Sequence, residues 1–266
     1  MSRRKKAKWN YDVYDRMLRK GRGQGHLSEY KPWITVYDFP SKGKVARICG
    51  KKTNRIHHLL SSLETMAFTL FDNDIHVTDI REQYPLDLGE TLRIAYHLGI
   101  PHPRINDCWY TMTTDFLVDM DSGQQIARAV KPKSELDNPR VREKLQIEEA
   151  YWKKHHVEWA VLTEENLNRT HVSNLQWLNY GEPLERLIPG SQDRKVTMDT
   201  FLDLYNMHEI PFMTLLSEFE ELGGYPPGTS IQIFKALILE NRIDIDLTQP
   251  IHRIEPRKRK LSCSYF

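Results

Sequence analysis

The sequence predicts two domains: a mixed α/β domain over residues 1–165 and a mainly helical, winged-helix-type domain over residues 166–266. The first prediction rests on the order helix, strand, helix, hairpin, helix, strand, which is typical of a mixed α/β layer. The second rests on a change of pattern after Thr163, where helical spacing of apolar residues continues without a strand until near the end. A length of 266 residues agrees with two cores, because domains are usually about 50–200 residues long.

The first domain opens with a basic arm and a predicted helix from Trp9 to about Lys20. The glycine-rich segment 21–25 that follows is preceded by no strand, so it is not a dinucleotide-binding loop. It is either a basic loop near a nucleic-acid backbone or a plain linker. Apolar residues three and four apart then predict an amphipathic helix over 54–71, with Asn54 as its N-cap.

The rest of this domain alternates strands and helices. We expect a strand over 77–81, a helix over 88–98 closed by Gly99, a β-hairpin of strands 114–119 and 125–131, a helix over 140–155 and a strand over 159–162.

The second domain is predicted to be a set of helices followed by a hairpin. The helices are expected over 170–178, 184–188, 196–207, 211–222 and 230–240. Alternating apolar residues from Ile243 to Ile254 then predict the hairpin, which gives the winged-helix interpretation. A winged helix binds either DNA or protein, and the fold alone does not decide between them.

Charge divides the chain into two basic ends and an acidic middle. Residues 1–60 hold 16 Lys and Arg against 4 Asp and Glu, residues 61–250 hold 17 against 31, and residues 251–266 hold 5 against 1. This pattern indicates termini that meet phosphates, and carboxylates that serve metal ions or protein partners. Charge alone leaves open the alternative of a solvated surface with disordered tails.

Composition argues against several classes of protein. No apolar stretch reaches the roughly 18 residues of a membrane span, and no hydrophobic run follows the basic start, so we expect an intracellular protein without a membrane partner. Cys49, Cys108 and Cys263 are too widely spaced for a disulfide framework or a structural zinc site. The motifs of serine hydrolases and P-loop NTPases are missing from the sequence.

The predicted hairpin places an acid and a lysine together. A three-residue loop over 122–124 would put Asp115 opposite Lys131, and opposed residues share a face of the sheet. A two-residue loop would put Asp115 opposite Val130 instead. The first register is preferred because it directs Phe116 and other apolar residues to one side.

An acid on one strand, a lysine on its neighbour and Glu64 on an earlier helix are the residues that metal-dependent phosphodiester hydrolysis needs. Carboxylates hold Mg²⁺, which polarises the phosphate and lowers the pKa of an attacking water. A lysine stabilises the additional negative charge or orients the water. The pattern alone is also that of a structural salt bridge.

Four separated segments resemble the TnsA family, the endonuclease subunits of heteromeric cut-and-paste transposases. They are residues 54–64, 79–86, 113–119 and 130–132, and the segment 21–25 with Pro32-Trp33 is also similar. The resemblance spans about residues 20–160 and implies a restriction-endonuclease-like, mixed-sheet nuclease domain. The second half resembles the family only in length and in its helical, winged-helix pattern.

The resemblance also implies a function. Such a protein cuts the 5′ ends of a transposon, while a separate integrase-like transposase cuts the 3′ ends and an AAA+ ATPase regulates the complex. Glu64 and Asp115 would hold Mg²⁺, for which Mn²⁺ can substitute, and Lys131 would be the catalytic lysine. Transposon-end DNA is the implied substrate.

One position departs from the family pattern. The residue two before the lysine is glutamine in the family and Ala129 here, so metal coordination would fall to Glu64, Asp115, the Val130 carbonyl and water. Glu148 or Glu149 could compensate, although a solvated helix face is the preferred interpretation of both.

DNA contacts are expected from the basic arm and from two further residues. They are Arg3, Arg4, Lys5, Lys6, Lys8, Arg22 and His57. The basic tail, Arg253 with residues 257–260, could also touch DNA, although docking to the transposase and the ATPase is the preferred function of the second domain. Two other functions remain open: a stand-alone restriction or repair nuclease, and a non-catalytic assembly factor.

Overall fold

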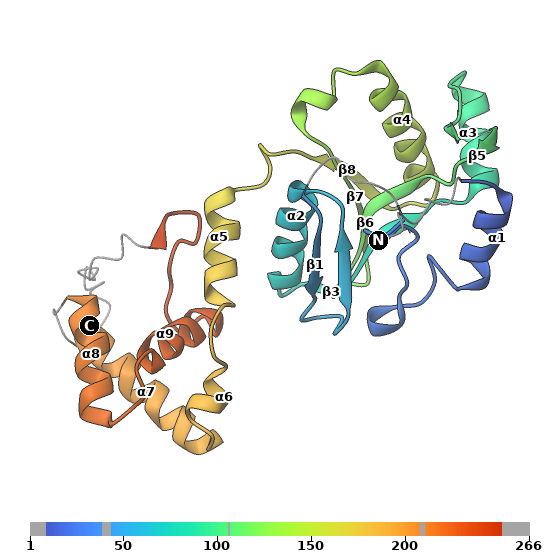
Figure 1. The fold of residues 1–266 in the computed structure, drawn as a ribbon. Coiled ribbons are helices and arrows are strands. Elements are labelled where there is room, and N and C mark those ends of the chain that lie inside the picture. Colours follow the sequence, from blue (N-terminus) through green and yellow to red (C-terminus); the bar gives the residue numbers. More distant parts are fainter. Residues whose placement is uncertain (1–8, 39–43, 106, 208–210, 252–266) are drawn as a thin grey trace, which may run out of the picture. The chain divides into compact units, whose positions relative to one another are not determined.

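The computed structural model describes residues 9–38, 44–105, 107–207 and 211–251 (Figure 1). The chain forms two compact units, one ending at Asn168 and the other beginning at Arg169. The first is mixed α/β and the second is helical, which confirms the predicted fold class. Among the described residues, no helix has both the length and the apolar character needed to cross a membrane.

The N-terminal unit is built on a four-stranded mixed sheet in the order β3-β6-β7-β8. Strands β3 (Val77–Pro85), β6 (Thr113–Met120) and β7 (Gln125–Val130) are antiparallel neighbours, and β8 (Glu158–Leu162) joins β7 in parallel. Two small sheets complete the strands. They pair β1 (Ala46–Cys49) with β2 (Ile56–Leu59), and β4 (Arg104–Ile105) with β5 (Cys108–Trp109).

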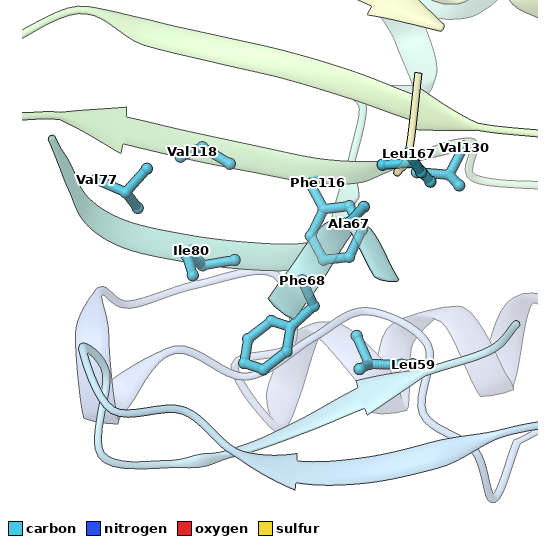
Figure 2. Close-up of a cluster of buried hydrophobic side chains, with 9 residues drawn as sticks. All are labelled: Leu59, Ala67, Phe68, Val77, Ile80, Phe116, Val118, Val130 and Leu167. Carbon is cyan, nitrogen blue, oxygen red and sulfur yellow. The ribbon is translucent and has the colours of Figure 1, made fainter. Parts of the chain in front are cut away.

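Two apolar clusters cover the two faces of the four-stranded sheet, because side chains alternate along each strand. Phe116 and Val118 of β6 pack with Phe68 of α2 (Ser62–Asn73) in one cluster, which Figure 2 shows. Leu117 belongs to the other cluster, together with side chains of α3 (Leu88–Leu98) and α4 (Pro139–Lys154). The sheet therefore lies between α2 on one side and α3 with α4 on the other.

The segment before the sheet packs closely rather than forming a plain linker. Helix α1 (Tyr11–Arg19) leads into the glycine-rich segment, and a short 3-10 turn, η1, covers Leu27–Glu29. Gly23 has φ +76°, and a Cβ on it would lie 2.2 Å from the Pro85 ring. These glycines therefore allow a tight contact between the segment and β3.

The helix predicted over 54–71 is wrong in its first half. Residues Ile56–Leu59 form β2, whose side chains alternate between exposed and buried, and Asn54 has φ +51° in the turn before it. The helix begins at Ser62, and Ser61 is its N-cap. Apolar residues in a short strand beside a helix reproduced the helical spacing by coincidence.

The hairpin of β6 and β7 forms, but its predicted register is wrong by two residues. Val118 pairs with Ile126 and Asp119 with Gln125, and the turn residue Gly123 has φ +81°. Glycine at this left-handed position favours a three-residue loop one residue earlier than predicted. A shift of two leaves every side chain on its expected face, so Asp115 and Lys131 stay on the same side.

The C-terminal unit is a set of helices around α9. Its helices are α5 (Arg169–Leu178), α6 (Leu184–Leu187), α7 (Ser191–Met207), α8 (Phe212–Gly223) and α9 (Thr229–Leu239), close to the predicted ranges. The other four all contact α9, where Ile233, Phe234 and Leu237 are fully buried. Helix α9 therefore supplies the apolar centre of this unit.

The hairpin expected from Ile243 to Ile254 is not formed where the structure can test it. Residues 243–251 contain no strand, and residues 252–254 lie outside the described part. Asn174 of α5 donates from Nδ2 to the carbonyl oxygens of Leu247 and Gln249, at 2.8 and 2.7 Å. This segment is therefore fixed to a helix by its backbone carbonyls instead of pairing as a wing.

Candidate active site

Glu64 is held in the first turn of α2 by the helix cap. The Ser61 hydroxyl accepts a hydrogen bond from the backbone N–H of Glu64 at 3.1 Å. The Glu64 carboxylate accepts one from the backbone N–H of Leu60, the residue before the N-cap Ser61, at 2.9 Å. The side chain is buried. These hydrogen bonds therefore fix both the backbone and the carboxylate of Glu64.

Asp115 and Lys131 meet at the end of β7. One Asp115 oxygen, Oδ2, accepts from the backbone N–H of Val130 and from Lys131 Nζ, both at 2.7 Å. Lys131 Nζ also donates to the Val130 carbonyl oxygen at 2.9 Å. The two side chains form an ion pair although they are not directly opposed in the observed register.

Gln83 joins the two acidic residues, although the sequence did not point to it as a site residue. Its amide Nε2 lies 3.2 Å from Asp115 Oδ1 and 3.4 Å from Glu64 Oε2. Thr113 donates from its hydroxyl to Gln83 Oε1 at 3.1 Å. Gln83 stands in one of the four segments that resemble the family, but its uncharged side chain gives little signal beside the charged Arg81 and Glu82.

Glu148 is a buried carboxyl on α4, not part of a solvated face. Its Oε1 accepts from the Thr114 hydroxyl at 2.8 Å and from the Trp159 indole at 3.0 Å. Trp152 donates to the same Thr114 hydroxyl at 2.6 Å. Glu149 beside it is exposed, as expected. Helical periodicity could have found Glu148, because it lies three residues after Leu145, three before Tyr151 and four before Trp152, all of which are buried.

Burial and mutual repulsion shift the carboxyl groups of the site. Burial, followed by the negative charge of Asp115, raises the pKa of Glu64 to about 7. Burial and the charge of Asp115 likewise raise the pKa of Glu148 to about 7. For Lys131, burial alone would lower the pKa, but the charge and hydrogen bond of Asp115 outweigh it and raise the pKa, so the lysine is cationic. The three acids therefore share one region of negative potential.

His57 is not available for DNA in this structure, which corrects the expected contact. Its side chain is 0% exposed. Its two ring nitrogens lie 2.7 Å from the Thr53 hydroxyl and 2.7 Å from Glu82 Oε2. Glu82 also accepts two hydrogen bonds from the Arg55 guanidinium, at 2.8 and 2.6 Å. Burial alone would raise the pKa of Glu82, but hydrogen bonds from His57 and Arg55 lower it to about 2.

Of the other expected DNA contacts, only Arg22 lies within the described residues. Its guanidinium donates to Asp38 at 2.5 Å and to the Trp33 carbonyl at 2.8 Å, so it fastens the N-terminal segment. The basic arm, Arg3, Arg4, Lys5, Lys6 and Lys8, lies outside the described part, as does the basic tail from Arg253.

The donors of the site fit a divalent cation such as Mg²⁺. Glu64, Asp115 and the Val130 carbonyl supply hard oxygen atoms, which this ion prefers. Ala129 is fully buried and adds no ligand. A second group, Asp79, Asp119 and His26, also brings possible metal ligands together, and Arg81 forms ion pairs with both of its carboxylates.

The fold and the site define a class of protein: a mixed-sheet α/β domain with paired carboxylates and a lysine, followed by a helical domain. A family model described as TnsA-like endonuclease N terminal matches residues 74–164, and one described as TnsA endonuclease C terminal matches residues 166–247. The chain belongs to the TnsA-like family. Asp115 and Lys131 lie within the first match, and Glu64 precedes it.

A curated relative agrees with this assignment. The Tn7 transposition protein TnsA of Escherichia coli is 43% identical to this chain over 165 residues, which are 61% of this chain and 60% of that protein. The chain thus spans about three-fifths of the length of the curated relative it matches.

Proposed function

We propose that this protein is a divalent-metal-dependent DNA endonuclease that cuts the 5′ ends of a transposon as one subunit of a larger transposase. The observation that carries the proposal is the arrangement at Asp115, which binds Lys131 through one oxygen and shares the Gln83 amide with Glu64 through the other. The endonuclease description of both matched family models supports the reaction.

Glu64, Asp115 and the Val130 carbonyl would hold Mg²⁺. When bound, the ion polarises the scissile phosphate and lowers the pKa of an attacking water. Glu64 and Asp115 would hold the ion in a fixed position, since both carboxylates accept hydrogen bonds from backbone N–H groups, of Leu60 and Val130. A site held in this way needs little reorganisation during the reaction.

Lys131 interacts with the phosphate and is not a ligand of the metal. As a compact cation it stabilises the negative charge that develops on the phosphate oxygens or orients the attacking water. Two further cations, Arg140 and Lys144, lie near it: burial, followed by the positive charges of Arg140 and Lys131, lowers the pKa of Lys144. These cations fit a phosphate backbone next to the acidic site.

Glu148 positions the strand that carries Asp115. Its carboxyl binds the hydroxyl of Thr114, the residue directly before Asp115 on β6. The indole groups of Trp152 and Trp159 complete this buried network. Glu148 therefore acts through β6, with no contact to the substrate required.

Partners follow from the family and from the surface. The curated relative is named a transposition protein, which supports a transposase with other subunits acting on transposon-end DNA. We assign 3′-end cutting to an integrase-like transposase and regulation to an AAA+ ATPase, both docking on the C-terminal unit. Exposed apolar side chains on that unit, among them Met207, Met213 and Leu222, support protein binding.

A metal series tests the proposed reaction. The wild-type protein is combined with its transposase and regulator on DNA that carries transposon ends, with Mg²⁺, Mn²⁺, Ca²⁺ or EDTA. We expect nicks at the 5′ ends with Mg²⁺ and Mn²⁺, and binding without cleavage with Ca²⁺, whose looser coordination positions water poorly. Cleavage that persists in EDTA would contradict the metal site, and cleavage by the chain alone on unrelated DNA would favour a stand-alone nuclease.

A further inference from the structure

Gln83 contacts both acidic residues of the site through a single amide nitrogen. Nε2 carries two hydrogens, and it lies within hydrogen-bonding distance of Asp115 Oδ1 and Glu64 Oε2, at 3.2 and 3.4 Å. The side chain is buried. Thr113 donates to the amide oxygen at 3.1 Å, which fixes the direction in which the nitrogen points. A neutral side chain thus joins two carboxyl groups whose charged forms repel each other.

The backbone of Gln83 is in an unusual conformation for a residue in a strand. Its φ is +49°, in the left-handed region that residues other than glycine rarely adopt. Strain of this kind persists only where the surrounding structure fixes it, and it is often found at functional sites.

Contacts on both sides fix this conformation. The Gln83 carbonyl accepts from the backbone N–H of Trp33 at 3.2 Å, and the Glu82 carbonyl accepts from the Tyr30 hydroxyl at 3.1 Å. The Glu82 side chain is held by Arg55 and His57. The N-terminal segment therefore turns the peptide so that the Gln83 amide reaches the two carboxylates.

The sheet places Gln83 and Ala129 on the two strands that flank Asp115. Glu82 pairs with Phe116 and Tyr84 with Thr114, so Gln83 lies opposite Asp115 on β3. Phe116 pairs with Arg128, so the same register brings Ala129 opposite Asp115 on β7. Of these two neighbours, only Gln83 has a polar side chain.

We propose that Gln83 is a positioning residue that pre-organises the metal site, holding Glu64 and Asp115 in place for a divalent cation. This inference rests on the proposed function, because it concerns the same two carboxylates. The amide keeps the two carboxyl groups together before the cation arrives, so the free-energy cost of bringing them together falls on folding rather than on metal binding. Partners of metal ligands commonly contribute about 10–100-fold to metal affinity.

Two alternative roles for Gln83 predict different effects on metal affinity. If Gln83 only occupied the space of the cation, its removal would free both carboxylates and tighten metal binding. If it served only the fold, its removal would lower stability and leave metal affinity unchanged.

The test is a calorimetric titration of the full-length protein with Ca²⁺, which should bind without turnover. Gln83→Leu and Gln83→Gly should each weaken Ca²⁺ binding about 10–100-fold. Thr113→Val should weaken it less, because the amide stays but its direction is no longer fixed. The matched control is Gln125→Leu, which removes a strand glutamine that donates to Asp119 at 2.7 Å and should leave Ca²⁺ affinity unchanged.

The two Gln83 variants separate positioning from folding. Glycine suits a positive φ, so Gln83→Gly removes the amide while relieving the backbone, and it decides the question if Gln83→Leu does not fold. Unchanged or tighter Ca²⁺ binding by Gln83→Gly would overturn the inference.

A final comparison separates this inference from the proposed function. Asp115→Asn should lose Ca²⁺ binding whether or not Gln83 contributes. If Asp115→Asn loses binding and the Gln83 variants do not, only the inference about Gln83 fails. If Asp115→Asn binds Ca²⁺ as the wild type does, or the wild type binds none, the metal site itself fails.

Discussion

Asp115 and Lys131 form a hydrogen-bonded ion pair, yet their expected contributions to the reaction differ. In the proposed reaction Asp115 would be a metal ligand, whereas Lys131 would act on the phosphate. Lys131→Met should retain Ca²⁺ binding, because it removes a cation from beside the metal site, but should slow nicking by at least about 100-fold, as loss of one transition-state stabiliser does. Ca²⁺ titration and single-turnover nicking on end DNA measure the two effects. Nicking at the wild-type rate would contradict the role of Lys131.

Glu64 should make the stability of the metal-free protein depend on pH. Its pKa is raised from 4.5 to about 7, so the folded state binds more protons than the unfolded state between these values. The contribution of Glu64 to the free energy of unfolding therefore falls as pH rises from about 4.5 to about 7, and it is constant above. Glu82, with a pKa lowered to about 2, contributes in the opposite direction and below this window.

A Glu64 variant without charge isolates the contribution of the Glu64 carboxyl to the free energy of unfolding. Glu64→Gln should stabilise the metal-free protein relative to wild type more at about pH 7.5 than at about pH 5, measured by urea unfolding. Glu148, whose pKa is also raised to about 7, is present in both proteins, so its contribution cancels in the comparison. An equal difference at the two pH values would show that the Glu64 pKa is not raised.

Residue types and family motifs were enough to select Glu64, Asp115 and Lys131, which the structure brings together. They were not enough for Gln83 and Glu148. Gln83 is uncharged and reaches the site only because its backbone turns to φ +49° under contacts from residues far away in the sequence. Glu148 stands among other charged residues of one helix, and its burial depends on the packing of α4 against the sheet.

Helix α4 offers a direct test of that packing, because Glu148 and Glu149 are adjacent and differ in exposure. Glu148→Gln should reduce nicking, since it changes the group that binds Thr114 next to Asp115. Glu149→Gln is the matched control and should nick at the wild-type rate. Equal effects of the two substitutions on single-turnover nicking would show that Glu148 acts only as part of a charged surface.

At the scale of elements, most helices and strands of both units could be predicted from periodicity and caps. Helix α3 and its closing Gly99 match the prediction, with Gly99 at φ +66°. Strand β2 was missed because four residues are too few to show alternation, and its pairing with β1 is a contact between separate segments. The hairpin register differed by two because the turn could be placed one residue earlier without changing any face.

At the scale of the whole molecule, charge separates the acidic body from the basic ends, and this separation predicts how the protein meets DNA. The arm, Arg3, Arg4, Lys5, Lys6 and Lys8, has no pattern with which to read bases, so we expect it to bind phosphates. Deleting residues 1–8 should weaken assembly on end DNA and flatten its salt dependence, by about 0.9 in the log–log slope for each phosphate that is no longer neutralised. An unchanged slope in binding titrations at several salt concentrations would contradict this role.

In the C-terminal unit the helices were predicted correctly, but the wing after them was not. Helical spacing predicted its five helices, because their apolar faces pack locally around α9. The alternation after Ile243 predicted a wing, but residues 243–251 follow the helices as an irregular segment that α5 holds by Asn174. Alternating apolar residues indicate a strand only where a partner strand is available, and sequence alone does not provide that information.

We propose that the site of Glu64, Asp115 and Lys131 makes the 5′-end cut. The most direct measurement maps both strands of transposon-end DNA after reaction with the complete transposase in Mg²⁺, using wild-type protein or Asp115→Asn. We expect the wild type to give cuts on both strands, and Asp115→Asn to lose the 5′-end cut while the 3′-end cut by the partner subunit remains. A 5′-end cut at the wild-type rate with Asp115→Asn would contradict the claim.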